Sequence, residues 1–319
     1  MVEVVSLGEA VIDMFAAPVG VDLPGAEHFV AAPGGAPANV AVALARLGVE
    51  TGFIGRVGAD SFGHMLVGLL GAEGIDTRCF LPLAEHPTML ALVAASGPEE
   101  QDFVLYHGAE EQLAPEDIDG EYLAGAKVLV YGSITLSGAA APAALRAAKL
   151  MADQGGLVAY DANLRPALWP DLPSARRGIL RGLATASVVK LNKAELELLS
   201  GSQDPLEGCR WVLAQGPALC VVTLGAAGAY FANGRARGAV PGFAVEALDT
   251  TGCGDGFLAG LIAGLLAEER DPAAIGPEGL TRIVRFANAV GALSAQAQGA
   301  MAGLPRRAAV EKLVADGVP

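Results

Sequence analysis

The chain has little positive charge. Its 319 residues contain 21 Lys and Arg against 35 Asp and Glu, which gives a formal net charge of −14 at pH 7. Binding to the phosphates of a nucleic acid needs clustered Lys and Arg side chains, so this composition argues against a nucleic-acid partner. A nucleotide substrate is not excluded, because backbone amides can hold phosphate groups even on an acidic protein.

Long hydrophobic runs and paired cysteines are also missing. The longest apolar stretch, residues 256–267, is shorter than the roughly 20 residues of a membrane-spanning helix. Residues 1–5 lack the positive charge and the length of a signal peptide. The four cysteines and four histidines show no zinc-ligand spacing. We therefore expect a cytoplasmic protein with reduced thiols and without a membrane partner.

Strands and helices alternate along most of the chain. The composition is 52% hydrophobic and 18% charged, as expected of a globular protein with deeply buried elements. The alternation predicts an α/β fold, in which helices flank a doubly wound, mostly parallel sheet. The expected strands include 2–7, 51–55, 128–131, 157–161, 188–191 and 219–224, and the expected helices include 40–47, 63–73, 140–153, 176–184, 194–199, 206–214 and 283–297.

Two insertions interrupt this alternation. Residues 11–16 and 28–32 form one pair of strand-like segments, and residues 88–95 and 102–106 form another around the polar turn 96–100. We predict a small β-sheet from residues 11–32 and 87–107, inserted into a core of residues 1–10, 33–86 and 108–319. Such a sheet can be a lid over a cleft or an ordinary edge extension. If its exposed face is apolar, two copies would pair through it as a homodimer.

The stretch 249–257 carries the strongest chemical signal. Gly252 and Gly254 allow a tight turn with open N–H groups, and an apolar helix follows. A glycine loop at a helix N-terminus binds anions, since free N–H groups and the positive end of the helix dipole coincide there. Asp255 lies at the mouth of this loop as a catalytic carboxylate or as a helix cap. Between these residues, Cys253 is either a small hydrophobe or a stabilised thiolate.

Further polar residues follow the expected strands, at 161–165, 190–195 and 223–228. Ligands of open α/β sheets bind at the carboxyl ends of the strands, so these segments predict a single site together with the 249–255 loop. Each has a structural alternative. Asn192 and Glu195 can form a capping box, and Lys190 can contact an anion or pair with an acid.

Two motifs resemble the signatures of the ribokinase-like (PfkB) sugar kinases. Residues 34–41, Gly-Gly-Ala-Pro-Ala-Asn-Val-Ala, are similar to the first signature, and residues 249–255, Asp-Thr-Thr-Gly-Cys-Gly-Asp, to the second. The resemblance extends from about residue 5 to residue 305. Within the family it is closest to bacterial fructokinases, through residues 8–13, 131–133, 161–165 and 168–169.

The resemblance implies ATP-dependent phosphorylation of a sugar hydroxyl. Asp255 would take the hydroxyl proton, and the N–H groups of Gly252, Cys253 and Gly254 would hold the charge on the transferred group. The remaining candidate residues fall into four groups, and all except Lys190, which is included for its place at the end of an apolar strand, are implied by the resemblance. These are Asp13, Gly34, Gly35, Asn39, Tyr106 and Arg165 for the sugar; Lys190, Asn192, Thr223, Gly225, Gly228 and Asn288 for the nucleotide; Asn192 and Glu195 for Mg²⁺ through water; and Asp249 and Thr251 for a monovalent cation such as K⁺.

The identity of the acceptor stays open at this stage. Fructose is the first choice, and the alternatives are 2-keto-3-deoxygluconate, ribose and a riboside such as aminoimidazole riboside. His107 stands where fructokinases tend to have Arg, which changes the charge of the lid over the sugar. A module that binds sugar or nucleotide without turnover is the non-enzyme alternative, and the intact Asp255 and glycine loop argue against it.

Overall fold

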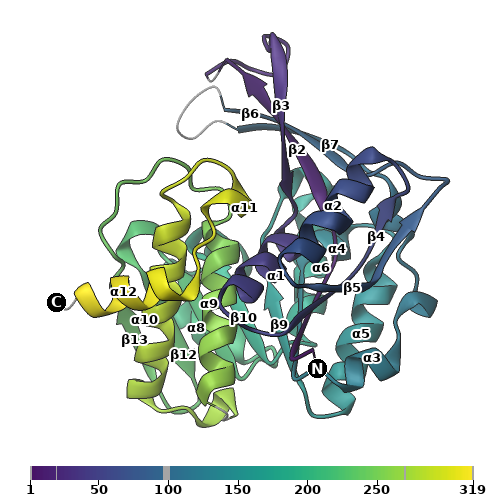
Figure 1. The fold of residues 1–319 in the computed structure, drawn as a ribbon. Coiled ribbons are helices and arrows are strands. Elements are labelled where there is room, and N and C mark those ends of the chain that lie inside the picture. The colour runs from purple at the N-terminus through teal and green to yellow at the C-terminus, as the bar shows by residue number, and fades with distance from the viewer. Residues whose placement is uncertain (1, 19, 96–100, 269–270, 318–319) are drawn as a thin grey trace.

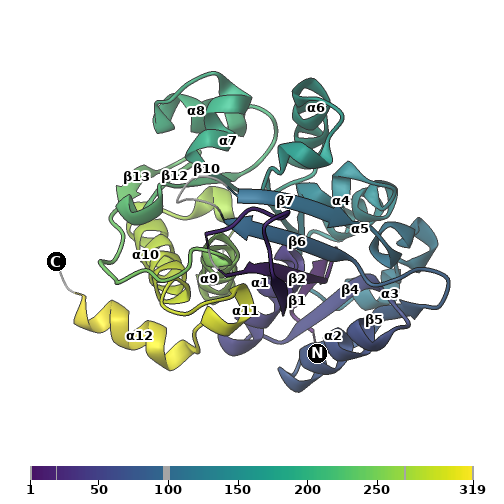
Figure 2. The same cartoon turned by 90° about the horizontal axis from the view of Figure 1, so that it is seen from above.

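The protein is built on two β-sheets of unequal size, which the computed structural model describes for residues 2–18, 20–95, 101–268 and 271–317 (Figures 1 and 2). The large sheet has nine strands in the order β13-β12-β11-β10-β9-β8-β1-β4-β5, of which β12 alone runs antiparallel to the others. These strands are β1 Val4–Leu7, β4 Thr51–Gly58, β5 Asp76–Leu83, β8 Val128–Gly132, β9 Leu157–Asp161, β10 Val188–Asn192, β11 Leu219–Thr223, β12 Ala229–Asn233 and β13 Arg237–Val240.

Helices cover both faces of the large sheet and enclose two cores (Figure 2). Successive strand residues point to opposite faces, so Val4 packs in one core and Val5 in the other. The first core lies under α1 Ala36–Arg46, α2 Ser61–Ala72, α9 Cys253–Glu268, α10 Pro277–Ser294, α11 Ala300–Gly303 and α12 Arg307–Asp316. The second lies under α3 Gly120–Ala124, α4 Ser133–Ser137, α5 Ala141–Asp153, α6 Leu172–Leu183, α7 Lys193–Ser200 and α8 Pro205–Leu213.

The small sheet is separate from the large one, as predicted. Its order is β3-β2-β6-β7, formed by β2 Val11–Ala17, β3 His28–Gly34, β6 Leu90–Ala95 and β7 Gln101–Tyr106. In Figure 1 it projects above the layered core. The polar turn expected at 96–100 lies outside the described residues.

Hydrogen bonds hold the second insertion where it leaves and rejoins the core. The Asp60 carboxylate accepts from the Thr88 N–H at 2.8 Å and from the Thr88 hydroxyl at 2.7 Å. At the return crossing, the Ala109 N–H donates to the Pro87 carbonyl at 2.9 Å. The base of the small sheet is therefore fixed to the core at these crossings.

The doubly wound α/β fold is confirmed, and the differences from expectation are at element ends and edges. Helix α9 begins at Cys253, before the expected apolar run, because Gly252 at φ +79° lets the chain turn directly into it. The pattern missed β5 and β13, which are the two edge strands of the large sheet, and β12, which lies next to β13. Among the described residues, no helix has both the length and the apolar character that crossing a membrane requires.

Helices α9 and α10 pack closely through glycines. A Cβ on Gly260 would lie 2.8 Å from the Ala287 Cα, and one on Gly264 would lie 2.9 Å from the Ile283 side chain. Both separations are too short for a real Cβ, so larger residues would push the helices apart. This contact fixes the position of α9, whose N-terminus carries Asp255.

Candidate active site

Polar residues gather where β9, β10 and β11 end. The three strands are parallel neighbours, and their register pairs Lys190 with Asp161 and Asn192 with Thr223. Parallel strands end at the same edge of a sheet, so the segments after these strands meet in space. The sequence prediction that they contribute to one place is consistent with this register.

Asp255 forms the centre of the site with Asn39. The Asn39 side-chain amide donates to the Asp255 carboxylate at 2.8 Å, although the two residues are 216 positions apart. Asp255 is only 8% exposed. Burial and the nearby charge of Asp161 raise its pKa to about 6, against the opposing effects of Asn39, Lys190 and Arg165. The group is thus an anion at pH 7 that accepts a proton readily.

Lys190 forms the ion pair that the sequence allowed, and its contact with an anion stays a prediction. Its ammonium lies 3.0 Å from the Asp161 carboxylate, and both side chains are buried. A Cβ on Gly254 would lie 2.9 Å from the Lys190 Nζ, which places this cation against the glycine loop. Burial opposes the charge, but Asp161, Glu195 and Asp255 together raise the pKa of Lys190. A permanent positive charge therefore lies beside the N-terminus of α9.

The two glycines before α1 allow a close approach of the chain. The Asp13 carboxylate lies directly over Gly34, leaving no room for a Cβ there. Gly35 has φ +100°, and a Cβ on it would lie 2.6 Å from the Glu9 carbonyl. Burial and the charge of Asp255 raise the pKa of Asp13 to about 7, with Arg165 opposing. Asp13, Asp255 and Arg165 thus influence one another across one polar region.

Tyr106 does not lie on the same side of the small sheet as Asp13. The register of the small sheet places it in the row of Leu90 and Ile12, next to the row that contains Asp13. Adjacent rows point to opposite faces, so Tyr106 and Asp13 lie on opposite faces of the small sheet. Tyr106 is 56% exposed. Its role as a sugar contact stays a prediction.

Asn192 and Glu195 form a capping box at the start of α7. The Asn192 side chain accepts from the Glu195 N–H at 2.9 Å, and the Glu195 carboxylate accepts from the Asn192 N–H at 2.7 Å and from the Leu164 N–H at 2.8 Å. Among the described residues, no cluster of three or more His, Cys, Asp or Glu could hold a metal ion. Mg²⁺ usually keeps several waters and binds substrate phosphates, so these two side chains fit the outer partners of such an ion.

Asp249 joins the glycine loop to the segment before α11. Its carboxylate accepts from the Thr251 hydroxyl at 2.7 Å, the Thr251 N–H at 2.9 Å and the Gly299 N–H at 2.9 Å. Burial opposes ionisation, but the bonds from Gly299 and Thr251 hold the pKa of Asp249 below its usual range. Burial, with the charges of Asp249 and Asp255, raises the pKa of the Cys253 thiol to about 11. This favours the small hydrophobe over the thiolate at Cys253.

The residues expected at the nucleotide lie after β11 and on α10. Thr223 ends β11, and Gly225 and Gly228 have φ of +60° and +99° in the following turn. The Asn288 amide donates to the carbonyls of Val240 and Pro241, each at 3.1 Å. In this structure its N–H groups therefore hold the end of β13, and a contact with the nucleotide stays a prediction.

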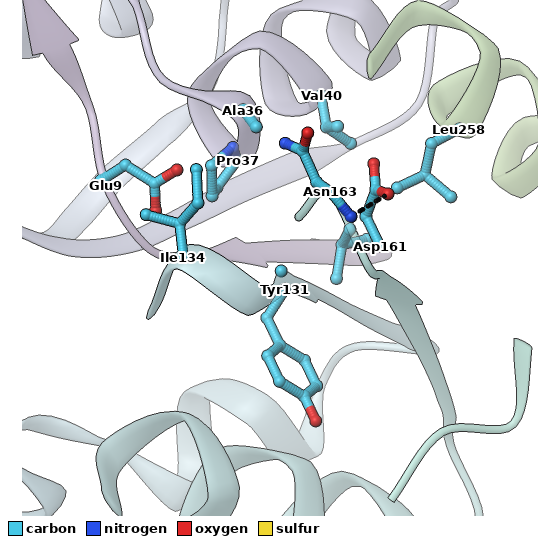
Figure 3. A pocket seen from close by; sticks show the side chains of 11 residues that line it. Glu9, Ala36, Pro37, Val40, Tyr131, Ile134, Asp161, Asn163 and Leu258 are labelled. Carbon is cyan, nitrogen blue, oxygen red and sulfur yellow. Dashed lines mark hydrogen bonds between the residues drawn. The ribbon is translucent and has the colours of Figure 1, made fainter. Parts of the chain in front are cut away.

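Sequence reasoning assigned no role to Glu9 or Asn163. Both line a pocket between the strand ends and α1, together with Asp161 (Figure 3). Asn163 has φ +28°, an uncommon value for a residue other than glycine. The available signal was the position of each residue directly after a buried strand, a place where ligand-binding residues concentrate.

Comparison with known proteins decides the family. The sequence model of the pfkB family carbohydrate kinases matches residues 1–307. The chain belongs to this family. As a carbohydrate kinase, it is 39% identical over 317 residues to fructokinase-1 of Oryza sativa subsp. japonica, covering 98% of this chain and 97% of that one.

Two solved structures of fructokinases resemble this carbohydrate kinase over nearly their whole length. That from Vibrio cholerae O395, in fructose, ADP and calcium ion bound form, has a TM-score of 0.85 and 33% identity, covering 98% of this chain and 99% of that one. That from Xylella fastidiosa, with bound ATP, has a TM-score of 0.89 and 31% identity, covering 98% of each.

The charges around Asp255 predict opposite pKa shifts in two variants. Lys190→Met removes a cation that stabilises the Asp255 carboxylate, so the pKa of Asp255 should rise above about 6. Asp161→Asn removes a repelling anion, so the same pKa should fall. Titration followed by NMR of ¹³C-labelled Asp carboxyl groups measures both. Shifts in the same direction, or none in either variant, would show that the pair does not control the charge of Asp255.

Proposed function

We propose that this carbohydrate kinase transfers the γ-phosphoryl group of ATP to a hydroxyl of fructose. The observation that carries the proposal is the buried Asp255 carboxylate, held by Asn39 at the N-terminus of α9 beside Lys190. A proton acceptor and two sources of positive potential thus lie together, as phosphoryl transfer to a hydroxyl requires. The similarity to fructokinases, including one with bound fructose and ADP, supports fructose as the acceptor.

In the proposed reaction, Asp255 accepts the proton of the attacking hydroxyl. Asn39, Asp13, Gly34, Gly35 and Arg165 would orient the sugar. These side chains and open backbone groups can position several hydroxyls, and fixing the reactants in place supplies much of the rate of phosphoryl transfer.

The glycine loop would hold the charge of the transferred group. The Cys253 N–H already donates to the Thr250 carbonyl at 3.2 Å, so we assign the anion contact to the amides of Gly252 and Gly254. Lys190 adds a positive charge beside Gly254. Mg²⁺ on the nucleotide phosphates, with Asn192 and Glu195 as water-mediated partners, would neutralise further charge. Thr223, Gly225, Gly228 and Asn288 would line the nucleotide, and Asp249 and Thr251 would lie near K⁺.

Phosphorylation of a panel of acceptors tests the assignment. We expect ADP release from Mg·ATP to be fastest with fructose, compared with tagatose, ribose, 2-keto-3-deoxygluconate and aminoimidazole riboside at equal concentrations. Preference for another acceptor would support the kinase activity and contradict the assignment of fructose as the acceptor. Silence with every acceptor, together with binding of ATP and sugar in titrations, would favour the binding-module alternative.

The small sheet, with residues 11–32 and 87–107, is proposed to act as a lid and as a dimer interface. Val104 and Tyr106 share one face of β7 and are 39% and 56% exposed. The face opposite to Asp13 is thus apolar and available to a second copy. A cytoplasmic location completes the proposal, since all four cysteines are free thiols, as is usual in reducing compartments.

A charge on this face tests the dimer. Val104→Lys would place an ammonium in the buried interface, so the variant should sediment as a monomer while the wild type sediments as a dimer. Glu121→Lys places the same ammonium at an exposed position on α3 outside the small sheet, and this control variant should leave the dimer intact. A monomeric wild type would contradict the proposal.

A further inference from the structure

Glu9 is a buried acid, and one of its carboxyl oxygen atoms lacks a hydrogen-bond partner among the described residues. It follows β1, directly after Gly8, and is 4% exposed. Its Oε2 accepts a long hydrogen bond from the Thr135 hydroxyl at 3.3 Å. Its Oε1 has no hydrogen-bond partner among the residues that the structure describes. A buried polar atom without a partner costs free energy, so the position calls for a partner that the folded chain does not itself supply.

Glu9 lines two pockets. The first lies beneath the proposed acceptor site, because its walls include Val40, next to Asn39, and Leu258, one helical turn after Asp255. In Figure 3 the Glu9 carboxyl group points toward Ala36 and Pro37 in the first turn of α1, with Asp161 and Asn163 farther along the same pocket.

The second pocket opens toward the end of the small sheet. Its walls include His107, Glu110, Glu111 and Thr135. Glu9 is therefore placed between the floor of the acceptor site and the segment that follows β7.

Burial and nearby charges favour the uncharged form of Glu9 at neutral pH. Burial raises its pKa to about 8, and the charges of Asp255 from α9 and Glu110 from the segment after β7 add to this effect. His107, whose Nδ1 lies 2.9 Å from Glu110, and Glu111 line the same pocket, and Asp161 faces the other pocket from β9. Below about pH 8 the carboxyl group carries one O–H donor besides its acceptor sites.

We propose that Glu9 is a further acceptor-binding residue, whose carboxyl group forms a hydrogen bond with a hydroxyl of the sugar in the pocket beneath Asn39 and Asp255. This rests on the proposed function, since it assumes a sugar bound against Asp255. The partner is a neutral hydroxyl group because the acidic side chains of Glu110, Glu111 and Asp161, which line the two pockets beside Glu9, would repel a carboxylate placed there. The residue thereby favours neutral sugars over sugar acids.

Variants at two positions separate this role from a structural one. Glu9→Ala should raise KM for fructose about 10-fold, through loss of one buried hydrogen bond, with KM for ATP unchanged. Glu9→Gln keeps a neutral donor of the same shape and should stay near the wild type. Thr135→Val removes the hydrogen bond to Glu9 but not the carboxyl group, so its KM for fructose should change much less than that of Glu9→Ala.

The pH profile gives a readout that a structural role would not change. In the wild type, KM for fructose should rise above pH about 8, because ionisation removes the O–H donor and adds a negative charge. Glu9→Gln cannot ionise, and its KM should lack this alkaline rise. Fructose analogues that each lack one hydroxyl group identify the partner of Glu9. For one analogue, the wild type should bind it more weakly than fructose, whereas Glu9→Ala should bind it and fructose equally well.

Three results would overturn the inference: an unchanged KM in Glu9→Ala, an alkaline rise that persists in Glu9→Gln, or a Thr135→Val variant that reproduces Glu9→Ala. If Glu9→Ala does not fold, the pH profile of Glu9→Gln decides alone. If the wild type phosphorylates another acceptor and not fructose, the proposed function is wrong, and the same variants are then measured with that acceptor.

Discussion

The site depends on burying one carboxylate between two helices that are far apart in the sequence. The Asn39 amide on α1 donates a hydrogen bond to the Asp255 carboxylate on α9. The distance between the two side chains therefore depends on how the two helices are placed. The close glycine contacts of α9 with α10 fix one side of this pair, and the close approach of Glu9 to Gly35 fixes the other. A carboxylate so constrained has a raised pKa, because burial removes it from water and Asp161 lies nearby.

The acidic character of the chain and its proposed handling of ATP are compatible because the positive potential is local. Lys190 lies against Gly254, and its charge is maintained by Asp161 despite burial. The N-terminus of α9 supplies a second positive potential from the backbone itself. The proposed recognition of phosphate thus requires no basic surface, although the formal net charge of the chain is −14. The acceptor side, by contrast, is dominated by acids, which suits an uncharged sugar.

The sequence was sufficient for the fold class and the family, since strand–helix alternation and the two glycine motifs are local signals. It could not assign partners across the fold. Lys190 was left between an anion contact and an ion pair, and the structure shows the ion pair with Asp161 because β9 and β10 are adjacent. Tyr106 and Asp13 lie on opposite faces of the small sheet because of the register between its strands. The sequences of such short strands do not determine that register. The sequence assigned no role to Glu9, because an acidic residue after a strand is common. Its buried oxygen atom without a hydrogen-bond partner can be recognised only in the three-dimensional structure.

The most direct test of the account is the turnover of Asp255→Asn, measured together with its binding of ATP and fructose. The substitution keeps the shape of the side chain and removes only its capacity to accept the proton. We expect both ligands to bind nearly as in the wild type while kcat falls by about 10²–10⁴-fold, the usual contribution of a general base. Near-normal turnover in this variant would contradict the central claim, because the buried carboxylate would then have no part in the reaction.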